Sequence, residues 1–231
     1  MRRRPAVLLA GAAVLAAGAV ALAAPPATVP LLTAPCALSS ADGEAGLSRD
    51  EARAAADAAA TALRDGTPLP PPSDDTGRAA AALAAGAQEA LTCRTSRPAR
   101  ADEVEGSDGL TPRAQRLRAE LEAAFGRQSL GGFAPGGVRS GHVEGSAHYD
   151  GRALDVFFRP VTPEGTARGW AVAQWAVAHA DELDVATVIF DRRIWSAGRS
   201  AEGWRAYRHP SGDDENPVLA HEDHVHVDVA R

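Results

Sequence analysis

The chain has 231 residues, a formal charge of −6 and no lysine. The acidic balance argues against a general nucleic-acid binder, which needs a basic surface, and the lack of lysine excludes Schiff-base chemistry and a P-loop. No aromatic residue lies before Phe125 and no histidine before His142. The earlier part, rich in Ala, Arg, Pro, Asp and Glu, has little large apolar surface to bury. We therefore expect the functional domain in the C-terminal half.

The first 24 residues have the layout of a secretory signal peptide. Three arginines precede 19 residues of only Ala, Val, Leu and Gly, and Ala21-Leu22-Ala23 forms a cleavage signal. The apolar run is long for a signal peptide, so an uncleaved membrane anchor that tethers the chain is the alternative interpretation. Either interpretation predicts a protein that is secreted or held in the cell envelope.

Residues 25–104 are predicted to form an Ala-rich helical spacer. Ser48 and Glu51 form a capping box, which predicts a helix ending at Asp65-Gly66, and a second Ala-rich helix is expected over 75–91. Outside the cytoplasm an even pair of cysteines is more readily a disulfide than a metal site. The sequence therefore predicts a Cys36–Cys93 disulfide that closes this segment.

Residues 105–231 are predicted to form an α+β domain: a small antiparallel sheet with flanking helices that holds a metal site. Each of the two predicted helices begins with Thr-Pro, a favourable cap followed by proline at the first helical position. Alternating or continuous apolar runs predict the strands. The helices are expected at 112–125 and 163–179, and the strands at 153–158, 185–190, 193–196 and 224–229.

Two segments of this domain contain the residue types of a metal site. His148 and Asp155 are seven residues apart, and Asp150-Gly151 between them is a turn signal that can return the chain. In the last strand, His224 and His226 point to one face and the intervening valines to the other. Two histidines and one carboxylate leave the fourth position of a catalytic zinc ion open for water. We therefore predict one zinc ion per chain, bound by His148, Asp155 and His226.

Residues 146–155, SAHYDGRALD, fit the pattern S-x-H-x-x-G-x-A-x-D. This pattern resembles the zinc D-Ala-D-Ala carboxypeptidases and related peptidoglycan endopeptidases, whose superfamily includes lysostaphin-type enzymes and the hedgehog N-terminal domain. The resemblance covers about residues 110–231. The region also looks like a secreted actinobacterial domain with a terminal DHVHV motif. The resemblance implies the same zinc ligands, with His226 as the last histidine of the H-x-H motif.

The resemblance also implies substrate-binding residues. Gly137-Val-Arg139-Ser140 looks like the Arg-Ser that precedes the first motif in the family, where the arginine contacts the scissile carbonyl or a substrate carboxylate. We take Arg139 and Ser146 as substrate-binding candidates. His142 is interpreted as a structural residue.

The general base is left open among three residues. The carboxypeptidases have Glu three positions before the last ligand, where this chain has Asp223. Strand alternation would instead bring Glu222 to the ligand face, and His221 is the third candidate. His224 is expected to orient the water or to bind the reaction intermediate.

These features predict a secreted zinc metallopeptidase that hydrolyses peptidoglycan peptide stems, as a D,D-carboxypeptidase or an endopeptidase. The alternative is a zinc-stabilised module that binds the cell surface without cleaving it. A metal-dependent nuclease is disfavoured by the charge, so no nucleic-acid partner is expected. The sequence does not indicate an oligomeric state.

Overall fold

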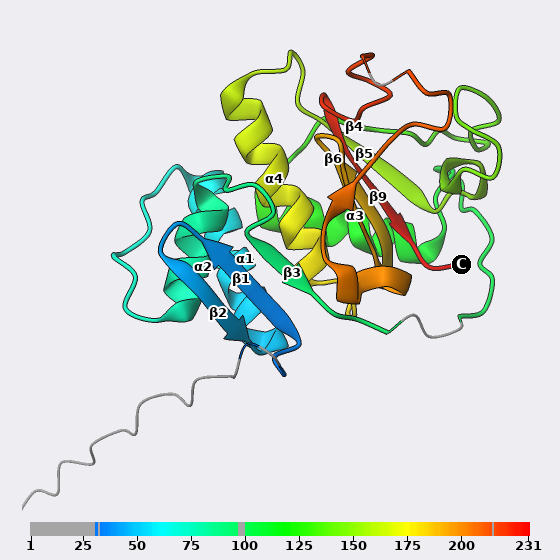
Figure 1. The fold of residues 1–231 in the computed structure, drawn as a ribbon. Coiled ribbons are helices and arrows are strands. Elements are labelled where there is room, and N and C mark those ends of the chain that lie inside the picture. Colours follow the sequence, from blue (N-terminus) through cyan, green and yellow to red (C-terminus); the bar gives the residue numbers. More distant parts are fainter. Residues whose placement is uncertain (1–30, 32, 97–99, 214) are drawn as a thin grey trace, which may run out of the picture.

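The computed structural model describes residues 31, 33–96, 100–213 and 215–231. The predicted signal segment, 1–24, lies outside them. The described residues form helices and antiparallel sheets, which confirms the predicted α+β class (Figure 1). Among these residues, no helix has both the length and the apolar character needed to span a membrane.

The larger sheet has six strands in the order β4-β5-β9-β6-β7-β8, and neighbouring strands are antiparallel. The last strand of the chain, β9, therefore lies inside the sheet between β5 and β6 (Figure 1). The strands are β4 (Leu130–Gly131), β5 (Ala153–Phe157), β6 (Val185–Phe190), β7 (Arg193–Ser196), β8 (Arg205–Ala206) and β9 (His224–Val229).

Helices α3 (Pro112–Phe125) and α4 (Pro163–Ala178) pack against β9. Both begin as predicted, because Thr111 and Thr162 accept a backbone hydrogen bond at the cap. The three valines of β9 have no exposed surface and belong to the core, as expected for alternate residues of one strand. The histidines of β9 consequently face the other side of the sheet.

The N-terminal segment contains helices α1 (Arg49–Asp65) and α2 (Asp75–Ala84). The capping box at the start of α1 is formed, and α1 ends at a left-handed Gly66. Helix α2 ends well before residue 91, because Gly86 adopts a positive φ and the chain turns into a strand.

Three short strands that were not predicted, β1 (Cys36–Ser40), β2 (Gly43–Leu47) and β3 (Leu91–Cys93), form a second antiparallel sheet. The Ala, Ser and Gly residues of β1 and β2 have low strand propensity, which explains why the sequence does not reveal them. Cys36 and Cys93 lie opposite each other on β1 and β3 and form the predicted disulfide.

Strand β3 is bound to the C-terminal part of the chain by the buried side chain of Gln174 on α4. Its Oε1 accepts from the backbone N–H of Leu91 (2.6 Å), and its Nε2 donates to the carbonyls of Ala87 (2.9 Å) and Trp170 (3.1 Å). Gln174 has no exposed surface, so water cannot replace these bonds.

Three of the four tryptophans also donate their indole N–H to the N-terminal segment. Trp175 donates to Asp57 (2.9 Å), Trp195 to the carbonyl of Cys93 (3.2 Å) and Trp204 to the carbonyl of Leu91 (3.0 Å). The buried residues of both segments form one hydrophobic cluster. Residues of the Ala-rich segment thus form part of the core under the larger sheet.

We predict that Gln174→Met, which keeps the side-chain length, lowers the free energy of unfolding by about 2–4 kcal/mol. It would leave the N–H of Leu91 buried without its partner, at about 1–3 kcal/mol, and would also remove the partner of the partly buried carbonyl of Ala87. Urea unfolding monitored by circular dichroism measures the change. Gln128→Met, at a partly buried glutamine that bonds only local carbonyls, is the control, and an equal effect of both substitutions would contradict the prediction.

Candidate metal centre

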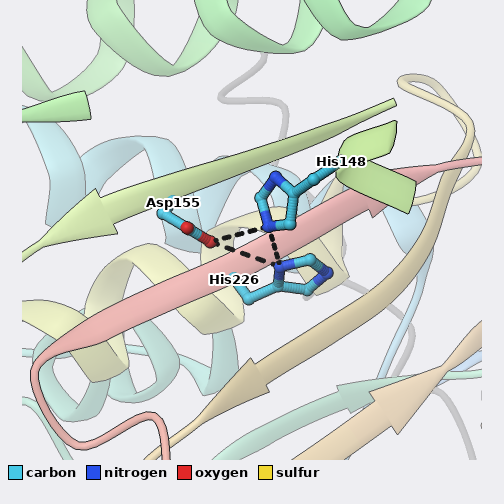
Figure 2. A group of neighbouring side chains, drawn as sticks. All are labelled: His148, Asp155 and His226. Atoms are coloured by element: carbon cyan, nitrogen blue, oxygen red, sulfur yellow. Dashed lines mark hydrogen bonds and ion pairs between the residues drawn. The ribbon is translucent and has the colours of Figure 1, made fainter. Parts of the chain in front are cut away.

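His148, Asp155 and His226 come together on the open side of the larger sheet, where three of their side-chain atoms converge (Figure 2). His148 Nε2 lies 3.0 Å from His226 Nδ1, and Asp155 Oδ1 lies 3.3 Å from each of these nitrogens. All three residues are buried. The structure thus places the three predicted ligands in one group that could hold a metal ion.

The spacing of the three atoms fits a small tetrahedral ion. Nitrogen and oxygen ligands about 2.0–2.1 Å from a tetrahedral zinc ion lie about 3.3 Å from one another. The three observed separations, 3.0–3.3 Å, agree with that triangle. The residues therefore fit a divalent metal with three protein ligands and one further position.

The local fold explains how each ligand reaches the site. Asp155 on β5 lies directly opposite His226 on β9 in the strand register, so both side chains point to the same face. His148 is in a short 3-10 helix, η1 (Ala147–Asp150), which ends at a left-handed Gly151. This tight turn returns the chain into β5 and brings His148 back over Asp155, as the Asp150-Gly151 signal predicts.

Each histidine ligand has a polar partner behind its ring. His148 Nδ1 lies 2.8 Å from the carbonyl oxygen of Gly132, which can only accept, so Nδ1 carries a proton and Nε2 is the nitrogen directed at the other two ligands. His226 Nε2 lies 3.5 Å from a carboxylate oxygen of Asp228. Such outer partners orient metal-binding histidines and raise their basicity. Asp228 and Gly132 therefore support the site from behind.

The electrostatics of the group favour bound cations. Burial alone would raise the pKa of Asp155, but hydrogen bonds from His148 and His226 outweigh burial and hold that pKa well below its usual range. Burial would lower the pKa of His226, but hydrogen bonds to Asp155 and Asp228 raise it to about 9. Without a metal, the group therefore holds a proton that a metal ion would displace.

Asp223 and His224 form a second pair beside the ligands. Asp223 is buried, and its Oδ1 accepts from His224 Nδ1 at 2.6 Å. His224 Nε2 then faces the metal group, 3.8 Å from Asp155 Oδ1. The other oxygen of Asp223 accepts from Arg159 Nε at 2.5 Å. Asp223 thus reaches the ligand group through His224, as an orienting carboxylate.

The other two candidates for the base occupy different positions. His221 lines the pocket with its ring 4.6 Å from that of His224, and its Nδ1 lies 3.1 Å from the carbonyl of Leu219. Burial, followed by the nearby His224 and His226, lowers the pKa of His221 to about 3, so its ring is neutral at pH 7. Glu222 pairs instead with Arg192 (2.6 Å) and does not line the pocket formed by the described residues.

Two of the three ligands, Asp155 and His226, line a pocket of about 720 Å³. Among its lining residues, His142 stacks on His148 with ring centroids 4.0 Å apart. Tyr149 fixes the backbone of His142, because its hydroxyl donates to the carbonyl (2.6 Å) and accepts from the N–H (2.9 Å). His142, interpreted from the sequence as structural, therefore covers one ligand and forms part of the pocket wall.

The two substrate-binding candidates lie in different places. Ser146 lines the pocket, and its hydroxyl accepts from the backbone N–H of His148 (3.4 Å) at the start of η1. Arg139 lies outside the described pocket lining and forms an ion pair with Glu105 (3.2 Å). Substrate binding by Arg139, which the resemblance implies, stays a prediction. Arg139 does not contribute to the geometry of the metal site.

Sequence reasoning did not identify Gly132, Arg159 and Asp228 as site residues. A signal existed for Asp228, which shares the strand face of His224 and His226. Gly132 and Arg159 reach the site only through strand pairing and loop packing, and short motifs carry no signal for such contacts.

We predict that Gly132→Ala weakens zinc binding by about 100-fold or more, because an added Cβ would lie 2.3–2.5 Å from the His148 ring and displace it. Gly136→Ala is the matched control, since Gly136 has a similar positive φ but no neighbour within 4 Å. Competition with a chromophoric chelator measures both affinities. Equal zinc affinities of the two variants would show that the close approach of Gly132 to the His148 ring does not affect metal binding.

We also predict that Asp228→Asn weakens zinc binding about 10- to 100-fold, because a neutral amide makes His226 a poorer donor. The same chelator competition measures the effect. Asp181→Asn, which removes the surface partner of Arg49, should leave the zinc affinity unchanged. An unchanged zinc affinity in Asp228→Asn would show that Asp228 does not support the metal site.

Comparisons with known proteins give one match. A family described as "VldE, C-terminal domain" matches residues 106–218, a little under half of the chain. The matched region is similar to that family and contains His148 and Asp155, but it ends before His226. No curated protein matches the chain, and no solved structure matches it.

Proposed function

We propose that this protein is a secreted metallopeptidase that hydrolyses the peptide stems of peptidoglycan with one zinc ion bound by His148, Asp155 and His226. The observation that carries the proposal is the triangle of ligand atoms, with separations of 3.0–3.3 Å, at the base of an open pocket. Three protein ligands are typical of catalytic zinc sites, whereas structural sites are closed by four.

The reaction class follows from the residues around the triangle. A zinc ion held there would polarise a carbonyl and lower the pKa of a bound water to about 7. His224 donates its Nδ1–H to Asp223, so Nε2 is the nitrogen that faces the metal group. This nitrogen can take the proton of the attacking water and return it to the leaving amine. We therefore infer that His224 acts as the base and Asp223 as its orienting partner.

The substrate class rests on the resemblance of residues 146–155 to peptidoglycan peptidases. The pocket is large enough for several atoms of a peptide, and its lining combines polar groups with exposed apolar residues from two loops. Val143 and Val218 are the exposed apolar residues at its rim. The predicted export and the Cys36–Cys93 disulfide agree with a site of action outside the cytoplasm.

The proposal is tested by measuring metal content and hydrolysis on the same preparation. We expect about one zinc per chain, and mass spectrometry of digested peptidoglycan should show cut stem peptides that disappear with a chelator and return with zinc. Asp155→Ala should lose both the metal and the products, since it removes one of three ligands. Arg116→Gln, at an exposed arginine of α3, is the control.

His224→Ala separates catalysis from binding. We expect this variant to keep zinc, because His224 is not one of the three ligands, and to lose at least about 100-fold in rate. Zinc in the wild-type protein without any product would instead favour the alternative, a zinc-stabilised module that binds the cell surface. Absence of zinc and of chelator-sensitive products would contradict the proposal.

A further inference from the structure

Arg159 is the one arginine among the described residues that line the pocket. It lies two residues after the end of strand β5, and its side chain is 51% exposed, so its charged end reaches the open space above the ligands. The other ionisable pocket residues are histidines, Tyr207 and the carboxylates Asp155 and Asp228. Arg159 is therefore the permanent positive charge of the described pocket.

Two contacts hold the guanidinium in one orientation. Its Nε donates to the buried Asp223, and its central carbon lies 4.1 Å from the centre of the Phe157 ring. The contact with Phe157 covers one face of the planar group, and the bond to Asp223 occupies one edge. Within the described part of the chain, the bonds of Arg159 involve Nε alone, which leaves the edge with the two Nη groups for a ligand.

We propose that the Nη edge of Arg159 binds a carboxylate of the substrate. This inference rests on the proposed function, since it specifies the substrate of the same pocket. Two parallel N–H donors match the two oxygens of a carboxylate, and the pair is stronger than a neutral hydrogen bond. The carboxylate is either the C-terminal group of the peptide or a free carboxylate within it.

The position of Arg159 couples recognition to the reacting residues. Arg159 and His224 both donate to Asp223, and His224 Nε2 on the far side of its ring lies 3.8 Å from Asp155 Oδ1 of the ligand group. A carboxylate on the outer edge of Arg159 would then lie beside the Asp223–His224 pair. Arg159 is thus a specificity-determining residue that also positions Asp223.

The test compares Arg159→Gln with the wild-type protein on three peptides: an acetylated stem pentapeptide, its C-terminal amide, and the same acid with its internal carboxylate amidated. Loss of the Asp223 contact lowers kcat for all three, so the ratio of kcat/KM between peptides isolates recognition. We expect the wild-type preference for the recognised acid to be about 10- to 100-fold, mainly through KM, and to disappear in Arg159→Gln. In the wild-type protein, a lower kcat/KM for the C-terminal amide would identify the C-terminal carboxylate as the bound group. A lower kcat/KM for the peptide with the amidated internal carboxylate would identify the internal carboxylate instead.

An unchanged preference in Arg159→Gln would overturn the inference. Arg159→Lys, which keeps the charge but loses the planar pair of donors, should restore only part of the preference. Arg116→Gln is the control and should keep the wild-type ratios.

Calorimetric titration of the zinc-loaded protein with the same three peptides separates this inference from the proposed function. If no peptide is cleaved, the proposed function fails, yet tighter binding of an acid that depends on Arg159 would still support carboxylate recognition. Equal binding of acid and amide by the wild-type protein would contradict it.

Discussion

The register between β5 and β9 is the constraint on which the metal group depends. It sets Asp155 opposite His226 on one face of the sheet, and the valines of β9 against α3 and α4 on the other. A slip of one residue would turn the ligands into the core and the valines into water. The burial that stabilises the fold therefore also holds two ligands within 3.3 Å of each other. The third ligand, His148, depends on the left-handed turn at Gly151 and on the carbonyl of Gly132.

The parts of the fold that could be predicted from the sequence are those with a local signal. Thr-Pro at the starts of α3 and α4 and the capping box at Ser48 mark helix starts with the residues that make the cap. The alternation of His and Val in β9 has the period of a strand, so the shared face of its histidines follows from the sequence. The turn at Asp150-Gly151 likewise predicts that His148 and Asp155 approach each other.

The remaining features arise from contacts between distant residues or from segments of weak propensity. Strands β1 and β2 are built from Ala, Ser, Gly and few larger residues, and β1 also pairs with the distant β3, to which the disulfide joins it. The partnership of Asp223 with Arg159 spans 64 residues, and no spacing rule relates the two. The ion pair of Arg139 with Glu105 depends on how two loops meet. Such contacts can be recognised only when the arrangement of the strands and loops in space is known.

The hydrogen bonds of Gln174 and of the tryptophans have a consequence for the order of folding. Those that reach the N-terminal segment join residues 83 to 118 positions apart, from Leu91–Gln174 to Asp57–Trp175. As the chain is synthesised, the disulfide segment emerges first, but its partners on α4 and beyond follow much later. We therefore expect that segment to stay incompletely packed until most of the chain is present, and folding to be slow, since loops must close before these contacts stabilise anything.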